Sequence, residues 1–156
     1  MEDKVFGALM YDDDGYWIAD RQIKFGENTF FVEIIIFGDD TDVTEAQRDV
    51  YVQLMNGWSD IREKLIDKLL AYYNNQERFS YGPKNWWPEI NTKDELLQAI
   101  ELETIVIPED FLLKNERRAY LLFSRSWGGD DIDDNGIGVC LVNEEIYDIG
   151  YKDIAF

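Results

Sequence analysis

Hydrophobic and polar positions alternate most clearly in residues 29–37. Four apolar side chains share one face of this segment: Phe30, Val32, Ile34 and Ile36. The opposite face is partly apolar as well, so the pattern predicts a central strand of an antiparallel meander. Two further strands are predicted before it, at residues 5–10 and 16–25, with an acidic turn between them.

A helical pattern follows this strand. The segment Thr44-Glu45-Ala46-Gln47 fits a capping box, which places a helix start at Thr44. To about residue 73, apolar residues then recur every three or four positions: Val50, Leu54, Trp58, Ile61, Leu65, Leu69 and Tyr72. We expect one long helix whose stripe packs against the strand at residues 29–37. Gly57 marks a point where the helix would kink or split.

The second half of the chain predicts one short helix and four strands. A second capping box, Thr92 to Glu95, opens a helix that ends near residue 100. Strands are predicted at residues 103–107 and 118–127, and a final hairpin at residues 137–142 and 145–149. Strands and helices are segregated along the chain, which favours the α+β class. We expect a single domain, residues 1–156, with a mainly antiparallel sheet and one long and one short helix packed on one face.

The charge of the chain indicates which kinds of partner it could bind. The 156 residues include 33 acidic and 15 basic side chains, a net charge of −18. Nucleic acid and anionic membranes are therefore excluded as partners, whereas a basic protein or divalent cations would be attracted. The alternative is that the acidity serves solubility alone. Three acidic runs fall in predicted turns and are the candidate partner-binding residues: Asp12, Asp13 and Asp14; Asp39, Asp40 and Asp42; Asp130 and Asp131.

Residue types that commonly carry catalysis are scarce. The chain contains no histidine, which excludes the usual nucleophile–base pairs and imidazole metal sites. Its single cysteine, Cys140, lies inside a predicted strand and is expected to be a small buried core residue. The sequence therefore favours a protein that is not an enzyme and that has no cofactor and no metal site.

One acidic segment keeps a metal alternative open. Residues 131–136 match the first half of a calcium loop, but its twelfth position is Val142, where a bidentate glutamate is needed. Strands are also predicted on both sides instead of helices. An acidic turn is the favoured interpretation, and a calcium-dependent protein or a hydrolase that uses the carboxylates of residues 130–135 is the alternative.

The pair Trp86-Trp87 lies in a long polar connection between the two predicted helices. Exposed aromatic residues commonly form the centre of protein interfaces, so Trp86 and Trp87 are candidate apolar anchors for a partner. The favoured alternative is that this connection folds back and closes one end of the core.

Several C-terminal motifs together resemble a bacterial family of domains of unknown function. They are Ser126-Trp127-Gly128-Gly129, then residues 134–139 (Asp-Asn-Gly-Ile-Gly-Val), the turn at Asn143-Glu144 and a closing Gly150-Tyr151-Lys152-Asp153. The family ends in a hairpin of the form W-D-x-E-H-G-x-G-V. This chain carries Asp134-Asn135 in place of the Glu-His pair, a change that a structural turn permits.

The resemblance implies a role as well as a fold. Members of that family are similar to accessory proteins encoded near bacterial polymorphic toxins, which suggests an immunity protein. Combined with the charge, it implies a non-enzymatic, acidic protein-binding module whose partner is a basic protein such as a toxin domain. The N-terminal residues lack the pattern of a signal peptide, so a cytoplasmic location is expected, and the sequence does not indicate an oligomeric state.

Overall fold

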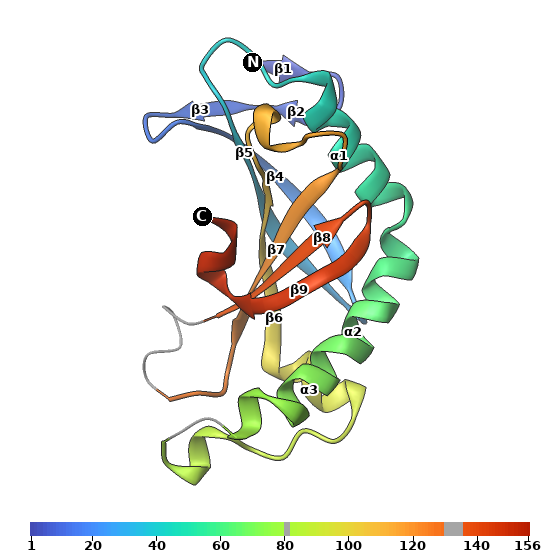
Figure 1. Ribbon diagram of the computed structural model, residues 1–156, viewed down its shortest axis with the longest axis vertical. Helices are drawn as coiled ribbons and strands as arrows, with labels where there is room; N and C mark the ends of the chain where they lie inside the picture. Colours follow the sequence, from blue (N-terminus) through green and yellow to red (C-terminus); the bar gives the residue numbers. More distant parts are fainter. Residues whose placement is uncertain (80–81, 130–135) are drawn as a thin grey trace.

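The fold is α+β, as predicted (Figure 1). The computed structural model describes residues 1–79, 82–129 and 136–156. Its strands are β1 (Glu2–Asp3), β2 (Gly7–Ala8), β3 (Met10–Asp12), β4 (Tyr16–Phe25), β5 (Asn28–Phe37), β6 (Ile100–Ile107), β7 (Arg118–Arg125), β8 (Ile137–Val142) and β9 (Glu145–Tyr151). Its α-helices are α1 (Glu45–Asn56), α2 (Trp58–Asn75) and α3 (Lys93–Ala99). Four short 3₁₀ turns complete the described chain: η1 (Glu77–Phe79), η2 (Lys84–Trp86), η3 (Asp110–Leu112) and η4 (Lys152–Ala155).

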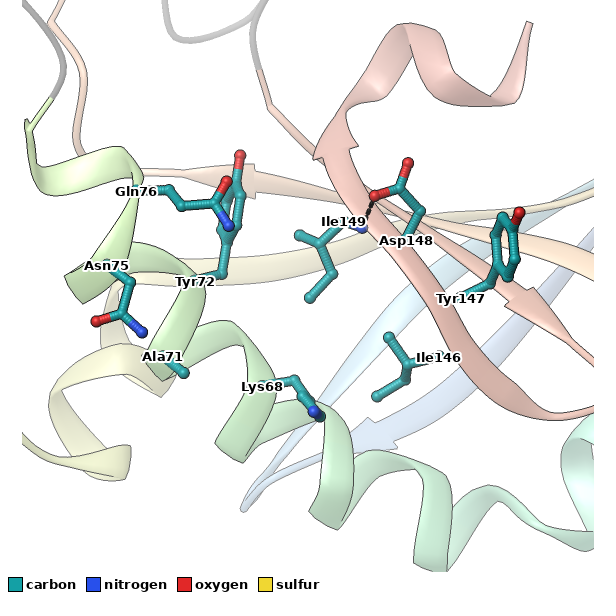
Figure 2. A pocket seen from close by; sticks show the side chains of 9 residues that line it. All are labelled: Lys68, Ala71, Tyr72, Asn75, Gln76, Ile146, Tyr147, Asp148 and Ile149. Atoms are coloured by element: carbon teal, nitrogen blue, oxygen red, sulfur yellow. Dashed lines mark hydrogen bonds between the residues drawn. The ribbon is translucent and has the colours of Figure 1, made fainter.

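Seven strands form one sheet in the order β3-β4-β5-β6-β7-β8-β9. All neighbouring pairs are antiparallel except β5 and β6, which run parallel. The predicted meander is therefore wrong at this point, although β5 does lie inside the sheet. The three helices between β5 and β6 carry the chain back to the starting end of β5, and a parallel pair requires such a crossover. The two edge strands of the sheet are β3 and β9, and β9 runs beside α2 (Figures 1 and 2).

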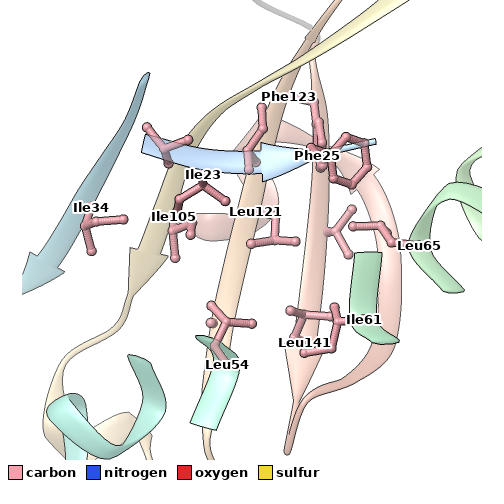
Figure 3. Close-up of a cluster of buried hydrophobic side chains, with 14 of the residues drawn as sticks. Ile23, Phe25, Ile34, Leu54, Ile61, Leu65, Ile105, Leu121, Phe123 and Leu141 are labelled. Carbon is pink, nitrogen blue, oxygen red and sulfur yellow. The ribbon is translucent and has the colours of Figure 1, made fainter. Parts of the chain in front are cut away.

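The predicted long helix exists as two helices joined at Gly57. The capping box at Thr44 is confirmed, since its hydroxyl accepts the Gln47 N–H at 3.2 Å and the Gln47 carboxamide accepts the Thr44 N–H at 3.0 Å. The apolar stripe is buried from Val50 to Leu69, together with the inner face of β5. Leu65 is completely buried there (Figure 3).

The end of this stripe differs from the prediction. Tyr73 is completely buried in α2, whereas the predicted Tyr72 is only partly buried. Tyr73 lies four residues after Leu69, so it continues the same helical spacing on the buried face of α2.

The predicted strand at residues 5–10 is only partly right, because β2 and the first residue of β3 lie in this range but residues 4–6 form a turn. The carboxylate of Asp3 accepts the N–H groups of Val5 and Phe6 at 2.9 and 3.0 Å, and Gly7 adopts a φ of 72°. These features form a tight turn between β1 and β2, and Phe6 is completely buried beneath it. The first part of the apolar run therefore reflects the burial of this turn, and two short strands replace the single predicted one.

The C-terminal hairpin of β8 and β9 is confirmed. Asn143 and Glu144 form its turn with φ values of 48° and 65°, a conformation that asparagine tolerates well. Cys140 is buried in β8, as predicted, and burial raises the pKa of its thiol. In the described parts of the chain, none of the helices combines the length and apolar character that crossing a membrane requires.

Candidate functional site

Two of the three acidic runs lie together at one end of the sheet. Strands β4 and β5 are equally long and pair Tyr16 with Phe37, so the segments just beyond them are neighbours. The Gly38 N–H donates to the Gly15 carbonyl at 3.3 Å. The first run precedes Gly15 and the second follows Gly38, and Figure 1 shows both at the N-terminal end of the molecule.

A third segment, around η3, joins them. Gln47 is buried, and its carboxamide nitrogen donates to the carbonyls of Phe37 at 2.7 Å and Pro108 at 2.9 Å. The carboxylate of Asp110 accepts the Thr44 hydroxyl at 2.7 Å. These bonds hold η3 against the second acidic run. We call the combined surface the acidic end, defined by Asp12, Asp13, Asp14, Asp39, Asp40, Asp42, Glu109 and Asp110.

Local hydrogen bonds explain why aspartate occupies these turns. The Asp12 carboxylate accepts the Asp14 N–H at 2.9 Å, and that of Asp39 accepts the Thr41 N–H at 3.1 Å. The hydroxyl of Thr41 also bonds to Asp39, and these bonds lower the pKa of the Asp39 carboxyl. The Asp39 carboxylate therefore stays ionised at neutral pH while it shapes the turn that displays it.

The carboxylates of all three segments act on one side chain, that of Tyr11. The pKa of Tyr11 is raised by burial and then by the charges of Asp40, Asp39, Glu109 and Asp13, which belong to all three segments. Its hydroxyl donates to the Gly38 carbonyl at 3.1 Å. The acidic end is thus one electrostatic unit assembled from three separate parts of the sequence.

The cation Arg48 lies within this surface. Arg48 contacts Asp42 at 3.0 Å and Asp3 at 2.7 Å, and its side chain is mostly buried. Burial by itself raises the pKa of the Asp3 carboxyl, but the hydrogen bonds from Arg48, Phe6 and Val5 lower it overall. Arg48 therefore anchors the second acidic run to the N-terminal turn and neutralises part of its charge.

Apolar groups lie beside the carboxylates. Phe111 and Leu112 in η3 are 67% and 51% exposed. A hollow of about 430 Å³ adjoins Leu112, and its other lining residues are Pro108, Lys114, Glu116, Arg118 and Tyr120. Sequence reasoning missed this feature, although the pair Phe111-Leu112 directly after Glu109-Asp110 in a short connection was a signal.

The candidate anchors Trp86 and Trp87 lie in the connection between α2 and α3, at the end of the molecule away from the acidic end (Figure 1). Both are partly buried. The Trp87 ring packs against the main core, and a Cβ atom added at Gly129 or Gly82 would clash with the ring of Trp86. The two indoles thus close this end of the core.

A buried ion pair supports this closure. Arg125 in β7 contacts Glu77 in η1 at 2.9 Å, and both side chains are almost fully buried. The Tyr72 hydroxyl donates to the same carboxylate at 3.0 Å, and burial followed by the charge of Glu77 raises the pKa of Tyr72. Because a buried pair is costly to separate, it ties the connection after α2 firmly to the sheet.

The third acidic run, including Asp130 and Asp131, lies outside the described residues, as do the other carboxylates of the calcium-loop match. Over residues 1–79, 82–129 and 136–156, acidic and cysteine side chains form no cluster able to hold a metal ion. Gly136 is described, and a Cβ atom there would clash with the Phe123 carbonyl and the Lys152 side chain. Close packing thus explains this glycine without a metal loop.

Comparison with models of known families shows which family this chain belongs to. A family model described as a domain of unknown function (DUF6985) matches residues 5–156. The chain belongs to the DUF6985 family. No curated protein and no solved structure gives a significant match. The DUF6985 match spans β2 to η4, so the acidic end and the closed opposite end both lie within the family's domain.

Proposed function

We propose that this DUF6985 domain is a non-enzymatic, acidic protein-binding module that engages a basic protein partner through the acidic end. The observation that carries the proposal is the assembly of three acidic segments, far apart in the sequence, into one surface. Such a surface attracts a basic partner over long range and repels nucleic acid. The resemblance to accessory proteins of toxin systems supports a cytoplasmic, bacterial immunity-type inhibitor whose partner is a toxin domain.

The apolar groups beside the carboxylates support tight binding. Exposed ion pairs are weak and screened by salt, so charge mainly accelerates the encounter. Most of the binding energy of an interface comes from a few buried apolar and aromatic groups at its centre. Phe111 and Leu112 are exposed within the acidic end and are placed to supply this centre. Trp86 and Trp87 remain predicted contacts for a part of the partner that reaches the opposite end.

The immunity role has a direct test. The genes that flank the coding sequence are identified, and any neighbouring toxin domain is expressed in cells with and without this chain. We expect the chain to restore growth, and we expect Phe111→Ser with Leu112→Ser to weaken this protection. A matched change at Phe31, which is 82% exposed on β5, should leave protection intact. Absence of a toxin gene, or toxicity that the chain does not relieve, would remove the immunity role.

A further inference from the structure

A groove follows the free edge of the sheet. Between α2 and β9 lies a hollow of about 350 Å³, whose walls include Lys68, Tyr72 and Ile149 (Figure 2). A second hollow of about 210 Å³ shares Lys68 and Ile146 with the first and extends along α2 to Lys64. A third, of about 340 Å³, shares Ile146 and continues past the hairpin turn. Together they run along most of the length of β9.

Strand β9 is suited to accept another strand. It has seven residues and, in the described parts of the chain, pairs with β8 alone. Such an edge presents unpaired main-chain groups. The exceptions are the Ile149 N–H, which donates to the Asp148 carboxylate at 2.9 Å, and the point where the register with β8 shifts, opposite Cys140 and Leu141. Its residues Ile146 and Ile149 are only partly buried, and Figure 2 shows both side chains directed toward α2. An added strand would cover these two side chains and extend the sheet, as in known peptide-binding domains.

The helix wall of the groove is basic, which is unusual in a chain of net charge −18. Lys64 and Lys68 are one helical turn apart on α2, and neither takes part in any ion pair among the described residues. On the opposite wall, the Glu144 carboxylate is held by Arg117 at 2.8 Å, and that of Asp148 accepts the Ile149 N–H at 2.9 Å. Glu145 lines the second and third hollows and forms no ion pair within the described residues. The two free ammonium groups therefore select for carboxylates on the side of an incoming strand that faces α2.

We propose that this groove binds an extended segment of a partner protein, which adds to β9 as an eighth strand and directs apolar and acidic side chains toward α2. The main chain of β9 supplies affinity through strand pairing, and Lys64 and Lys68 supply specificity for acidic side chains. A second copy of this chain is the poorer occupant. Antiparallel pairing of two β9 strands would bring acidic residues of both copies together, between two chains of net charge −18.

The groove differs from the acidic end in both position and charge preference, so each surface is tested separately. The probe is a capped peptide of seven residues, the length of β9, with the sequence Val-Thr-Glu-Thr-Val-Thr-Glu, so that its valines and glutamates share one face of the strand. A matched peptide carries lysine in place of glutamate. Binding is followed by nuclear magnetic resonance of the ¹⁵N-labelled full chain, and main-chain pairing by hydrogen exchange of the β9 amides.

We expect the glutamate peptide to bind about tenfold more tightly than the lysine peptide, because two exposed charge pairs change from attraction to repulsion. Bound peptide should shift the resonances of β9 and α2 and slow exchange of β9 amides. The double variant Lys64→Glu with Lys68→Glu should reverse the preference. The control Lys84→Glu with Lys114→Glu makes the same change in net charge elsewhere and should preserve it.

Three results would overturn the proposal. They are no binding of either peptide at millimolar concentration, equal binding of both peptides, and resonance shifts without protection of β9. Both lysines are exposed, so the charge-reversed variant is expected to fold, which circular dichroism checks. Should it fail to fold, Lys64→Gln with Lys68→Gln is substituted, and loss of the preference for glutamate is then the supporting result.

Discussion

Gln47 is the side chain that holds the acidic end together, and its replacement should be costly. Gln47→Ala removes one half of a capping box, worth about 1 kcal/mol. It also leaves the carbonyls of Phe37 and Pro108 without their donor, at about 1–3 kcal/mol for each buried group. The Phe37 carbonyl is partly buried and the Pro108 contact is fully buried. With the lower end of that range for Phe37 and the whole range for Pro108, the free energy of unfolding should fall by about 3–5 kcal/mol.

Urea unfolding at neutral pH measures this loss directly. Gln53→Ala is the matched control, because within the described residues the Gln53 carboxamide donates a hydrogen bond only to Asp49, at 3.3 Å on the helix surface. The control should change the free energy of unfolding by less than about 0.5 kcal/mol. A cost below about 1 kcal/mol for Gln47→Ala would show that water replaces its bonds, and the account of how η3 is held would fail.

The variant Gln47→Glu separates the two amide bonds from the capping bond. Its carboxyl still accepts the Thr44 N–H, but its charged form would face two carbonyl oxygens. Its folded-state pKa is therefore raised above the unfolded value of about 4.3. The stability that the protonated side chain gives the folded variant is fully present below the unfolded pKa of about 4.3. It is lost as the pH rises through the folded pKa. Relative to the wild type, this variant should thus lose stability between about pH 4 and pH 7, and a constant difference would refute the reasoning.

Three further predictions concern the core, the N-terminal turn and calcium. Leu65→Ala should cost about 2–5 kcal/mol in urea unfolding, because Leu65 is completely buried, and a smaller cost would place it outside the rigid core. The Asp3 carboxyl has a lowered pKa, so its contribution is present above the unfolded value of about 3.9 and is lost as the pH falls through the folded pKa. The stability difference between wild type and Asp3→Asn should accordingly shrink below about pH 4, and a difference that persists to pH 2 would contradict it. Calorimetric titration should detect no calcium binding in the micromolar range, whereas such binding would revive the calcium-dependent alternative built on Asp131, Asp133 and Asn135.

Local sequence patterns predicted most of the elements because their causes are local. The alternation in β5, the capping box at Thr44 and the N-cap at Thr92 each depend on residues within a few positions. The weak point at Gly57 became the actual break between α1 and α2. The apolar run at residues 5–10 was misleading because a carboxylate two residues earlier, that of Asp3, forms a turn instead.

Long-range arrangement was harder to predict from the sequence. Nothing in the pattern of β5 indicates that its second neighbour is β6 in parallel orientation, because that pairing depends on where three helices return the chain. The meeting of the first two acidic runs was within reach, since two strands of equal length joined by a short turn bring their outer ends together. The place of η3 beside these runs could not be predicted, because it depends on hydrogen bonds from Thr44 and Gln47 to residues more than sixty positions away.

The measurement that tests the central claim most directly is the rate of association with the basic partner domain at several salt concentrations, by stopped-flow fluorescence. Asp39→Asn, Asp40→Asn and Asp42→Asn are combined, because asparagine retains the acceptor oxygens that shape the second acidic run. A control with the same change in net charge combines exposed sites on α1, α2 and β6: Asp49→Asn, Glu63→Gln and Glu101→Gln.

For the wild type, we predict association that slows steeply as salt rises from low to physiological ionic strength. The acidic-end variant should associate roughly tenfold more slowly at low salt, with a flatter salt dependence and little change in dissociation. The control should lie close to the wild type. Association that is indifferent to salt, or an equal effect of both sets of substitutions, would contradict the account and leave the acidity of this domain as a means of staying in solution.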